Sequence, residues 1–201
     1  FEGREAKRVV YEGLILAILL YGSECWVLTE RLYDRLRVFH AQCVRSMNRV
    51  NRRHTREYHI STRDLEVEMG LESIDVYITR RQLRWLGHVA RMPYERLPRR
   101  MLSAWVATTR PSGGQLMNYG RTIYKAMAKM NIDAETWPTL ADDRSAWRAA
   151  IHGALLNSER PKRAAAAETN RRIDASLAEQ WLPSATRSRA LPPPMPPPPP
   201  G

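Results

Sequence analysis

The pattern that most constrains this fold is a run of apolar residues, spaced by four and three positions, along residues 32–50. At 100° per residue these side chains fall on one stripe of a helix. The stripe consists of Leu32, Leu36, Phe39, Cys43, Met47 and Val50. A neighbouring stripe consists of Arg31, Arg35, Arg45 and Arg49. Thr29 is the expected N-cap. The pattern predicts a mainly α-helical fold in which this helix packs by its apolar stripe.

A second long helix is predicted from Ile74 to Met92, with Ser73 as its cap and Pro93 just past its end. Its apolar arc consists of Ile74, Ile78, Trp85, Leu86, Val89 and Met92. Its adjacent basic arc consists of Arg80, Arg81, Arg84, His88 and Arg91. Leu83 falls outside both arcs. Gly87 either permits a close approach by another backbone or marks a kink.

Further helices follow from the same reasoning. Residues 5–21 form a helix that ends at Gly22, and its last third is apolar all round, as expected of a buried helix. Residues 51–60 are polar and basic and are predicted to form a loop. A short helix, capped by Ser61 or Thr62 and with Leu65 and Met69 inward, ends at Gly70.

Towards the C-terminus the patterns are weaker. Residues 101–106 are compatible with a strand or with a helical turn. Residues 110–115 form a linker, and residues 121–130 form an amphipathic helix with Ile123, Met127 and Met130 inward. Two short helical stretches surround Trp137 and Trp147. Trp85 and Trp105 are expected in the core.

The expected organisation is a small helical bundle over residues 1–109, a looser helical region over 110–160 and a low-complexity tail over 161–201. The tail is Ala- and Arg-rich at first, and its Pro-rich end is expected to be disordered and extended as polyproline II. The prolines from Pro192 to Pro200 either dock on SH3, WW or profilin-like domains or have no partner.

The charge points to a polyanionic partner. The chain has 32 Lys and Arg against 21 Asp and Glu, a formal net charge of +11. All but four of the basic residues are Arg, whose planar fork of donors suits phosphate. A GC-rich genome is the alternative explanation of that bias. Between Ile78 and Leu97 the single acidic residue is Glu95, and this deficit favours a phosphate-binding surface.

Catalytic and metal-binding patterns are weak. The chain contains no G-x-S-x-G, no Gly-rich loop ending in Lys-Ser/Thr and no H-E-x-x-H. Cys25 and Cys43 are 18 positions apart, too far for a zinc knuckle with His54 and His59, so no metal site is expected. The pair Asp142-Asp143 lies in a helix-like context, and one of the two is expected to cap a helix.

Location follows from what the chain lacks. Its longest apolar run, residues 14–21, is far shorter than the roughly 18 residues of a membrane span. No secretory signal opens the sequence, and two cysteines fit a reducing compartment. An intracellular protein of nucleus or cytoplasm, without a membrane partner, is expected. Because the sequence does not begin with Met, it is expected to be a fragment.

Several strings are more specific than any of these patterns. They are residues 19–26 (LLYGSECW), Leu32, Leu36 and residues 39–43 (FHAQC), residues 80–92 (RRQLRWLGHVARM) with Leu97-Pro98, and near the end residues 110–115 (RPSGGQ), 119–121 (YGR) and 143–148 (DRSAWR). Together they resemble the segment after the catalytic palm in reverse transcriptases of non-LTR (LINE-type) retrotransposons. The resemblance covers roughly residues 5–152.

The resemblance implies a helical thumb that grips the template–primer duplex, followed by an RNA-binding connector. In such enzymes the catalytic Asp residues, which hold Mg²⁺, lie upstream of the LLYGSE-type string, so this chain should not polymerise alone and needs no cofactor of its own. The expected partners are RNA and RNA–DNA or DNA duplexes, bound without sequence specificity, and the N-terminal polymerase part. The alternative is a non-catalytic interaction protein that acts through its polyproline tail.

The basic residues expected to contact phosphates lie on the two long helices and the segments after them. They are Arg45, Arg49, Arg52, Arg53, Arg80, Arg81, Arg84, His88, Arg91, Arg99 and Arg100.

Overall fold

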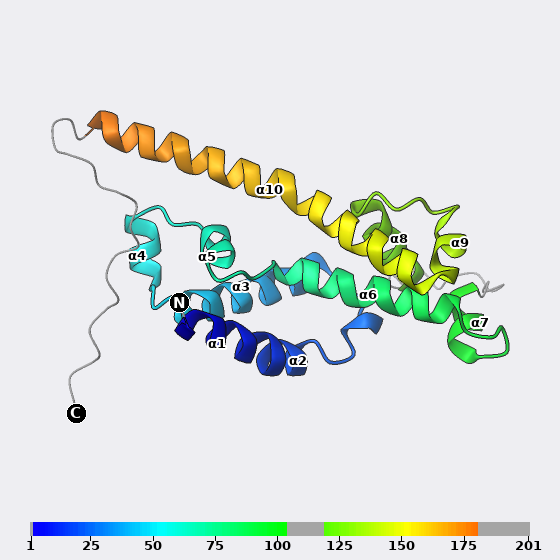
Figure 1. Ribbon diagram of the computed structural model, residues 1–201. Coiled ribbons are helices and arrows are strands. Elements are labelled where there is room, and N and C mark those ends of the chain that lie inside the picture. The colour runs from blue at the N-terminus through cyan, green and yellow to red at the C-terminus, as the bar shows by residue number, and fades with distance from the viewer. Residues whose placement is uncertain (1, 104–118, 181–201) are drawn as a thin grey trace, which may run out of the picture.

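The computed structural model describes residues 2–103 and 119–180, and every regular element in these ranges is helical (Figure 1). The elements are α1 (Glu2–Val10), the π-helical turn η1 (Tyr11–Ile15), α2 (Leu16–Leu19), the 3₁₀ turn η2 (Ser23–Cys25), α3 (Glu30–Met47), α4 (Arg52–Glu57), α5 (Thr62–Glu68), α6 (Ile74–Ala90), α7 (Leu97–Ser103), α8 (Tyr119–Lys129), α9 (Trp137–Asp142) and α10 (Arg144–Gln180). The predicted mainly α-helical class is confirmed for these residues. The linker at 110–115, Trp105 and the Pro-rich end lie outside them.

Helix α6 lies between the N-terminal helices and α10 (Figure 1) and contributes side chains to two hydrophobic cores. The first core joins it to the N-terminal elements through Tyr11, Leu16, Leu20, Val44, Leu65, Met69, Leu71, Ile74 and Ile78. The second core joins it to α8, α9 and α10 through Val76, Leu83, Leu86, Ala90, Ile123, Ala126, Met127, Met130, Trp137, Ala141, Trp147, Ile151 and Leu155. Leu83, which the predicted single arc left out, is fully buried because α6 carries two apolar arcs.

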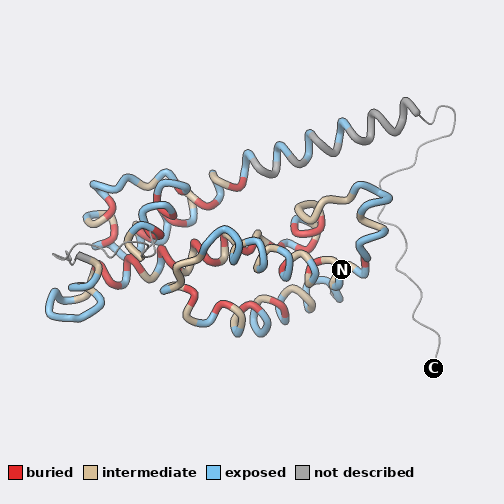
Figure 2. The backbone as a smooth tube through the Cα atoms, turned by 180° about the vertical axis from the view of Figure 1, so that it is seen from behind, coloured by how far each residue is buried: buried red, intermediate tan, exposed pale blue. Residues whose placement is uncertain are grey.

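The first helical segment is buried on one side only, contrary to the prediction. Tyr11, Leu16 and Leu20 face the first core, whereas Leu14 and Ile18 are 59% and 77% exposed. The reason is that α3 and α6 cover this segment from one direction. Figure 2 shows buried and exposed positions alternating along it. The all-round apolar sequence therefore gives an exposed apolar face rather than a buried helix.

Helix α3 forms as predicted, and most of its predicted stripe packs inward. The stripe residues that lie against the first core or are buried are Leu36, Cys43, Met47 and Val50. The difference is that His40 and Val44 are both at most 1% exposed, whereas Leu32 and Phe39 are 40% and 38% exposed. His40 is buried together with a polar partner, because the Tyr11 hydroxyl lies 2.7 Å from its Nδ1. A periodicity argument that ranks residues by apolarity does not place a histidine in the core.

The predicted loop at 51–60 instead contains α4, and this prediction was wrong. The Asn51 side chain accepts a hydrogen bond from the His54 amide at 2.8 Å and so caps a helical turn.

The predicted start and stop of α5 are confirmed. Ser61 and Asp64 form a reciprocal capping box, and Gly70 has a left-handed φ of 68°. Residues 101–103 belong to helix α7, so the strand alternative is excluded there.

Helix α10 is far longer than the short stretch predicted around Trp147. The Asp143 carboxylate accepts hydrogen bonds from the Ser145 and Ala146 amides, which confirms that this Asp pair supplies a helix cap. The helix then continues through Pro161 to Gln180. Its buried Glu159 pairs with Arg63 of α5, and the described side chains beyond Arg160 are exposed. No helix among residues 2–103 and 119–180 is long and apolar enough to cross a membrane.

The boundary predicted at residues 109 and 110 lies outside the described residues. It and the boundary at 160 and 161 stay predictions.

Candidate nucleic-acid interface

The basic arc of α6 is divided by its contacts into anchored and exposed residues. Arg80 pairs with Glu72 and lies over the Tyr77 ring. Arg81 donates to the Leu20 carbonyl at 3.3 Å, and Arg91 donates to the Ala141 carbonyl. These three guanidinium groups join α6 to the segments before and after it. A role in holding the fold together is therefore visible for each of them.

Arg84 and His88 are the exposed members of that arc. With Glu24, Arg81 and Trp85 they line a shallow hollow of about 260 Å³, called here the Trp85 hollow. The Trp85 and His88 rings lie 5.3 Å apart between centroids and are tilted by 50°. Trp85 is half-buried, so it belongs to this surface and not to the core where the sequence placed it. Its spacing, four residues after Arg81 and three before His88, places it on the same face of the helix as those two residues and was the available signal.

A second basic surface lies where α3 ends and α4 begins. We call it the α3–α4 corner and define it as Arg45, Arg49, Arg52, Arg53 and Arg56. Four of these side chains are exposed and Arg45 is half-buried. None of the five forms an ion pair with an acid in the part of the chain that the structure describes.

Arg45 is the member of the α3–α4 corner whose charged form is disfavoured by its surroundings. Burial and the positive charge of Arg52 lower the pKa of Arg45 below its ordinary value. Arg49 turns the chain between the two helices with a left-handed φ of 55°. Like charges that form no ion pair with an acid contribute little to the stability of the fold, and a cluster of them favours an anionic ligand. Arg56 was not among the predicted contacts, although Arg52 and Arg53 of the same segment were.

The remaining predicted contacts lie at the other end of the molecule. Arg99 is half-buried and Arg100 is exposed, both on α7. Figure 1 shows α7 and α4 near opposite ends of the elongated array of helices. The eleven predicted residues therefore do not form one patch. They are divided among the α3–α4 corner, the Trp85 hollow, α7 and the anchored arginines of α6.

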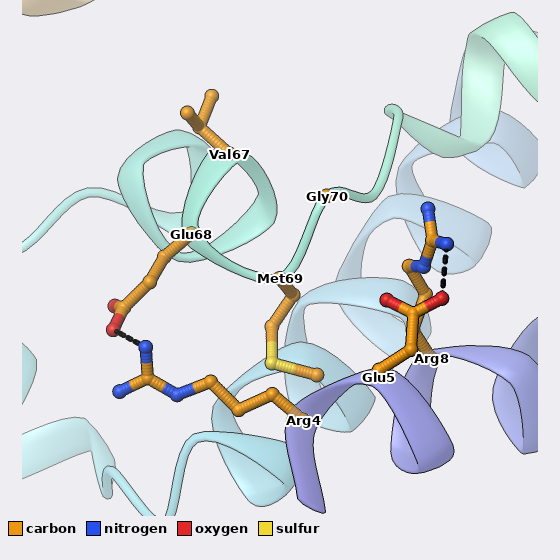
Figure 3. Close-up of a pocket in the computed structure, with 7 residues that line it drawn as sticks. All are labelled: Arg4, Glu5, Arg8, Val67, Glu68, Met69 and Gly70. Atoms are coloured by element: carbon orange, nitrogen blue, oxygen red, sulfur yellow. Dashed lines mark hydrogen bonds and ion pairs between the residues drawn. The ribbon is translucent and has the colours of Figure 1, made fainter. Parts of the chain in front are cut away.

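A larger hollow, of about 470 Å³, lies between α1 and the end of α5 (Figure 3). Its charges are neutralised locally, because Arg4 pairs with Glu68 at 2.7 Å and Arg8 pairs with Glu5. It offers no net attraction to a polyanion. Within the described ranges no group of three or more His, Cys, Asp or Glu side chains is arranged to hold a metal ion.

The strings that carry the family resemblance meet in the structure. Arg81 and Gln82 donate to the carbonyls of Leu20 and Trp26, which joins residues 80–92 to residues 19–26. The Trp147 indole donates to the Leu83 carbonyl at 2.9 Å, which joins residues 143–148 to the same helix. The three strings therefore form one packed unit around α6.

Comparison with known proteins gives one informative similarity. The chain is 28% identical over 154 residues to an uncharacterized transposon-derived protein of Caenorhabditis elegans. The aligned region is 74% of this chain and 55% of the relative, so the chain spans about half the length of that protein. No protein-family model and no solved structure matches the chain. The similarity supports an origin in a transposable element.

Proposed function

We propose that the chain is the duplex-gripping, thumb-like part of a non-LTR retrotransposon reverse transcriptase. Its similarity to a transposon-derived protein supports the general origin. The strings at residues 19–26, 80–92 and 143–148 support the specific assignment, since they resemble the segment after the catalytic palm of such enzymes. The chain is an accessory to polymerisation in this proposal. The catalytic Asp residues and the Mg²⁺ they hold belong to the polymerase part.

The observation that carries the proposal is the α3–α4 corner. Five arginines, none with an acidic partner among the described residues, lie within residues 45–56, around the turn between α3 and α4. Guanidinium groups bind phosphate oxygens through paired N–H donors. Contacts of this kind position a nucleic acid without reading its bases. The corner is therefore suited to gripping the backbone of a duplex of any sequence.

The exposed apolar face of the first segment supports the proposed partner. Val10, Leu14, Ile18 and Tyr21 are all more than half exposed along α1, η1, α2 and the turn after α2. Neighbouring exposed apolar side chains of this kind are typical of an interaction surface. We propose that it packs against the polymerase part, which the resemblance places before this segment in the parent protein.

The proposal is tested by measuring binding of the full chain to fluorescently labelled RNA–DNA hybrids by anisotropy. Two hybrids of unrelated sequence are compared, each between 50 and 200 mM salt. Five phosphate contacts predict affinities that differ by less than about threefold between sequences but fall by about 10²- to 10³-fold over this salt range. Affinity that does not change with salt would contradict a phosphate grip.

A further inference from the structure

We infer that the Trp85 hollow binds one unpaired base of a nucleic-acid strand and that Arg84 and His88 hold the adjoining phosphate. This inference rests on the proposed function and adds a site for unpaired strand to the backbone grip of the α3–α4 corner. It is argued from the aromatic ring, the charges around it and the rigidity of the hollow.

The aromatic surface is suited to stacking. Trp85 is half-buried and lines an open hollow, so part of its indole is accessible from solvent. Every base has a π face, and stacking on an aromatic side chain tolerates any sequence. At about 260 Å³ the hollow is smaller than the roughly 300–1,000 Å³ of pockets that enclose whole small molecules, so it admits a single ring system. In a duplex both faces of a base are covered by its neighbours, so an unpaired base is the matching ligand.

The charges around the ring specify an orientation. Arg84 and His88 are exposed and come from α6, whereas Glu24 comes from η2. Arg84 forms no ion pair in the described part of the chain, so its guanidinium group is available to a phosphate. Glu24 repels phosphate and can accept hydrogen bonds from exocyclic amino groups of a base. The phosphate is therefore expected on the α6 side and the base edge on the η2 side.

The hollow is also preformed. Arg81 donates to the Leu20 carbonyl and Gln82 donates to the Trp26 carbonyl at 3.1 Å, so α6 is fixed to the segment that carries Glu24. Gln82 is 1% exposed, which shields its hydrogen bond from competition with water. A rigid hollow loses little conformational entropy when it binds a ligand. Arg81, one of the anchored arginines of the basic arc, thus contributes to the site by holding α6 against the segment that carries Glu24.

The test compares a blunt RNA–DNA hybrid with the same hybrid carrying a four-nucleotide single-stranded overhang, in separate RNA and DNA arms. Anisotropy gives the affinity of the full-length protein for each. Wild-type protein is expected to bind an overhang more tightly than the blunt hybrid. Trp85→Ala should lower affinity for the overhang by about 5- to 100-fold and change affinity for the blunt hybrid by less than twofold.

Two further variants separate stacking from folding. Trp85→Phe keeps an aromatic face and should retain affinity for the overhang within about threefold, even if Trp85→Ala perturbs packing. Tyr94→Ala removes an exposed aromatic residue just beyond α6 and should bind like wild type. Equal effects of Trp85→Ala on both hybrids, or a Trp85→Phe protein as weak as Trp85→Ala, would overturn the inference. Salt-dependent binding of the blunt hybrid without any preference for an overhang would overturn this inference alone, whereas no binding of the blunt hybrid would overturn the proposed function as well.

Discussion

At the scale of single residues, the presence of glycine at position 87 is explained by the Trp147 indole, which packs against it. A Cβ atom at this position would lie 2.2 Å from Trp147 Nε1, a distance that no real contact tolerates. The sequence left two explanations open, a close approach by another backbone or a kink. The structure shows a close approach, but by a side chain, and the Trp147 indole completes it by donating to the Leu83 carbonyl.

Replacement of Gly87 by Ala should therefore destabilise the protein although alanine favours helices. Overpacking of this kind costs about 1–3 kcal/mol of unfolding free energy. The matched control is Gly153→Ala in α10, where a Cβ would meet no atom within 4 Å. That variant should gain about 0.5–1 kcal/mol from helix propensity. Urea unfolding followed by circular dichroism measures both, and a Gly87→Ala protein as stable as wild type would show that Trp147 does not pack here.

The cap of α10 should make stability depend on pH. Hydrogen bonds from the Ser145 hydroxyl, the Ser145 amide and the Ala146 amide lower the pKa of Asp143 below its ordinary value of 3.8. Because the ionised carboxylate is favoured in the folded state, its stabilisation is present above that ordinary value. It is lost as the pH falls through the lowered pKa.

Asp143→Ala should accordingly lower the melting temperature at pH 7, and its difference from wild type should shrink below about pH 4. Asp142→Ala serves as the control, because Asp142 is exposed and is not the residue that caps α10. Thermal unfolding at pH 7 and pH 3 makes the comparison. A difference between Asp143→Ala and wild type that is the same at both pH values would argue against a carboxylate cap.

At the scale of elements, the sequence located most helices but only part of the residues that each helix buries. Ser61 and Gly70 mark α5 correctly because caps and left-handed turns depend on local chemistry. The burial of His40 in α3 depends instead on Tyr11, which lies 29 positions away, and no local pattern reveals that contact. The same limit explains why the apolar segment at residues 14–21 was expected to be buried on all sides.

The one-sided packing of this first segment predicts a contrast between neighbouring residues. Leu14→Gln and Ile18→Gln should leave the unfolding free energy within about 0.5 kcal/mol of wild type, because both side chains are more than half exposed. Leu16→Ala and Leu20→Ala should each cost about 2–5 kcal/mol, because both are buried in the first core. Denaturant unfolding distinguishes the pairs. Equal losses of unfolding free energy in the glutamine variants and in the alanine variants would mean that this segment is covered on both sides.

At the scale of the whole molecule, α6 connects the two cores and carries residues 80–92, on which the strings at residues 19–26 and 143–148 pack. These strings pack on one another in the structure. Gln82 donates to the Trp26 carbonyl, and the Trp147 indole donates to the Leu83 carbonyl. The interface was predicted only in part, because some of the predicted arginines are engaged in contacts within the molecule. Composition and spacing identified α6 as basic, but they do not reveal that Arg80, Arg81 and Arg91 are engaged within the molecule. Arg52 and Arg53, predicted from charge alone, are exposed on the α3–α4 corner.

The central claim, that the α3–α4 corner grips phosphates, is tested most directly by the salt dependence of binding in an Arg52→Ala/Arg53→Ala protein. The control is Arg171→Ala/Arg172→Ala, which removes the same charge from exposed residues of α10 that pair with Glu168. Loss of two phosphate contacts should reduce the slope of log affinity against log salt by about two in the corner variant, and the control should keep the wild-type slope. Equal slopes in all three proteins would contradict the claim.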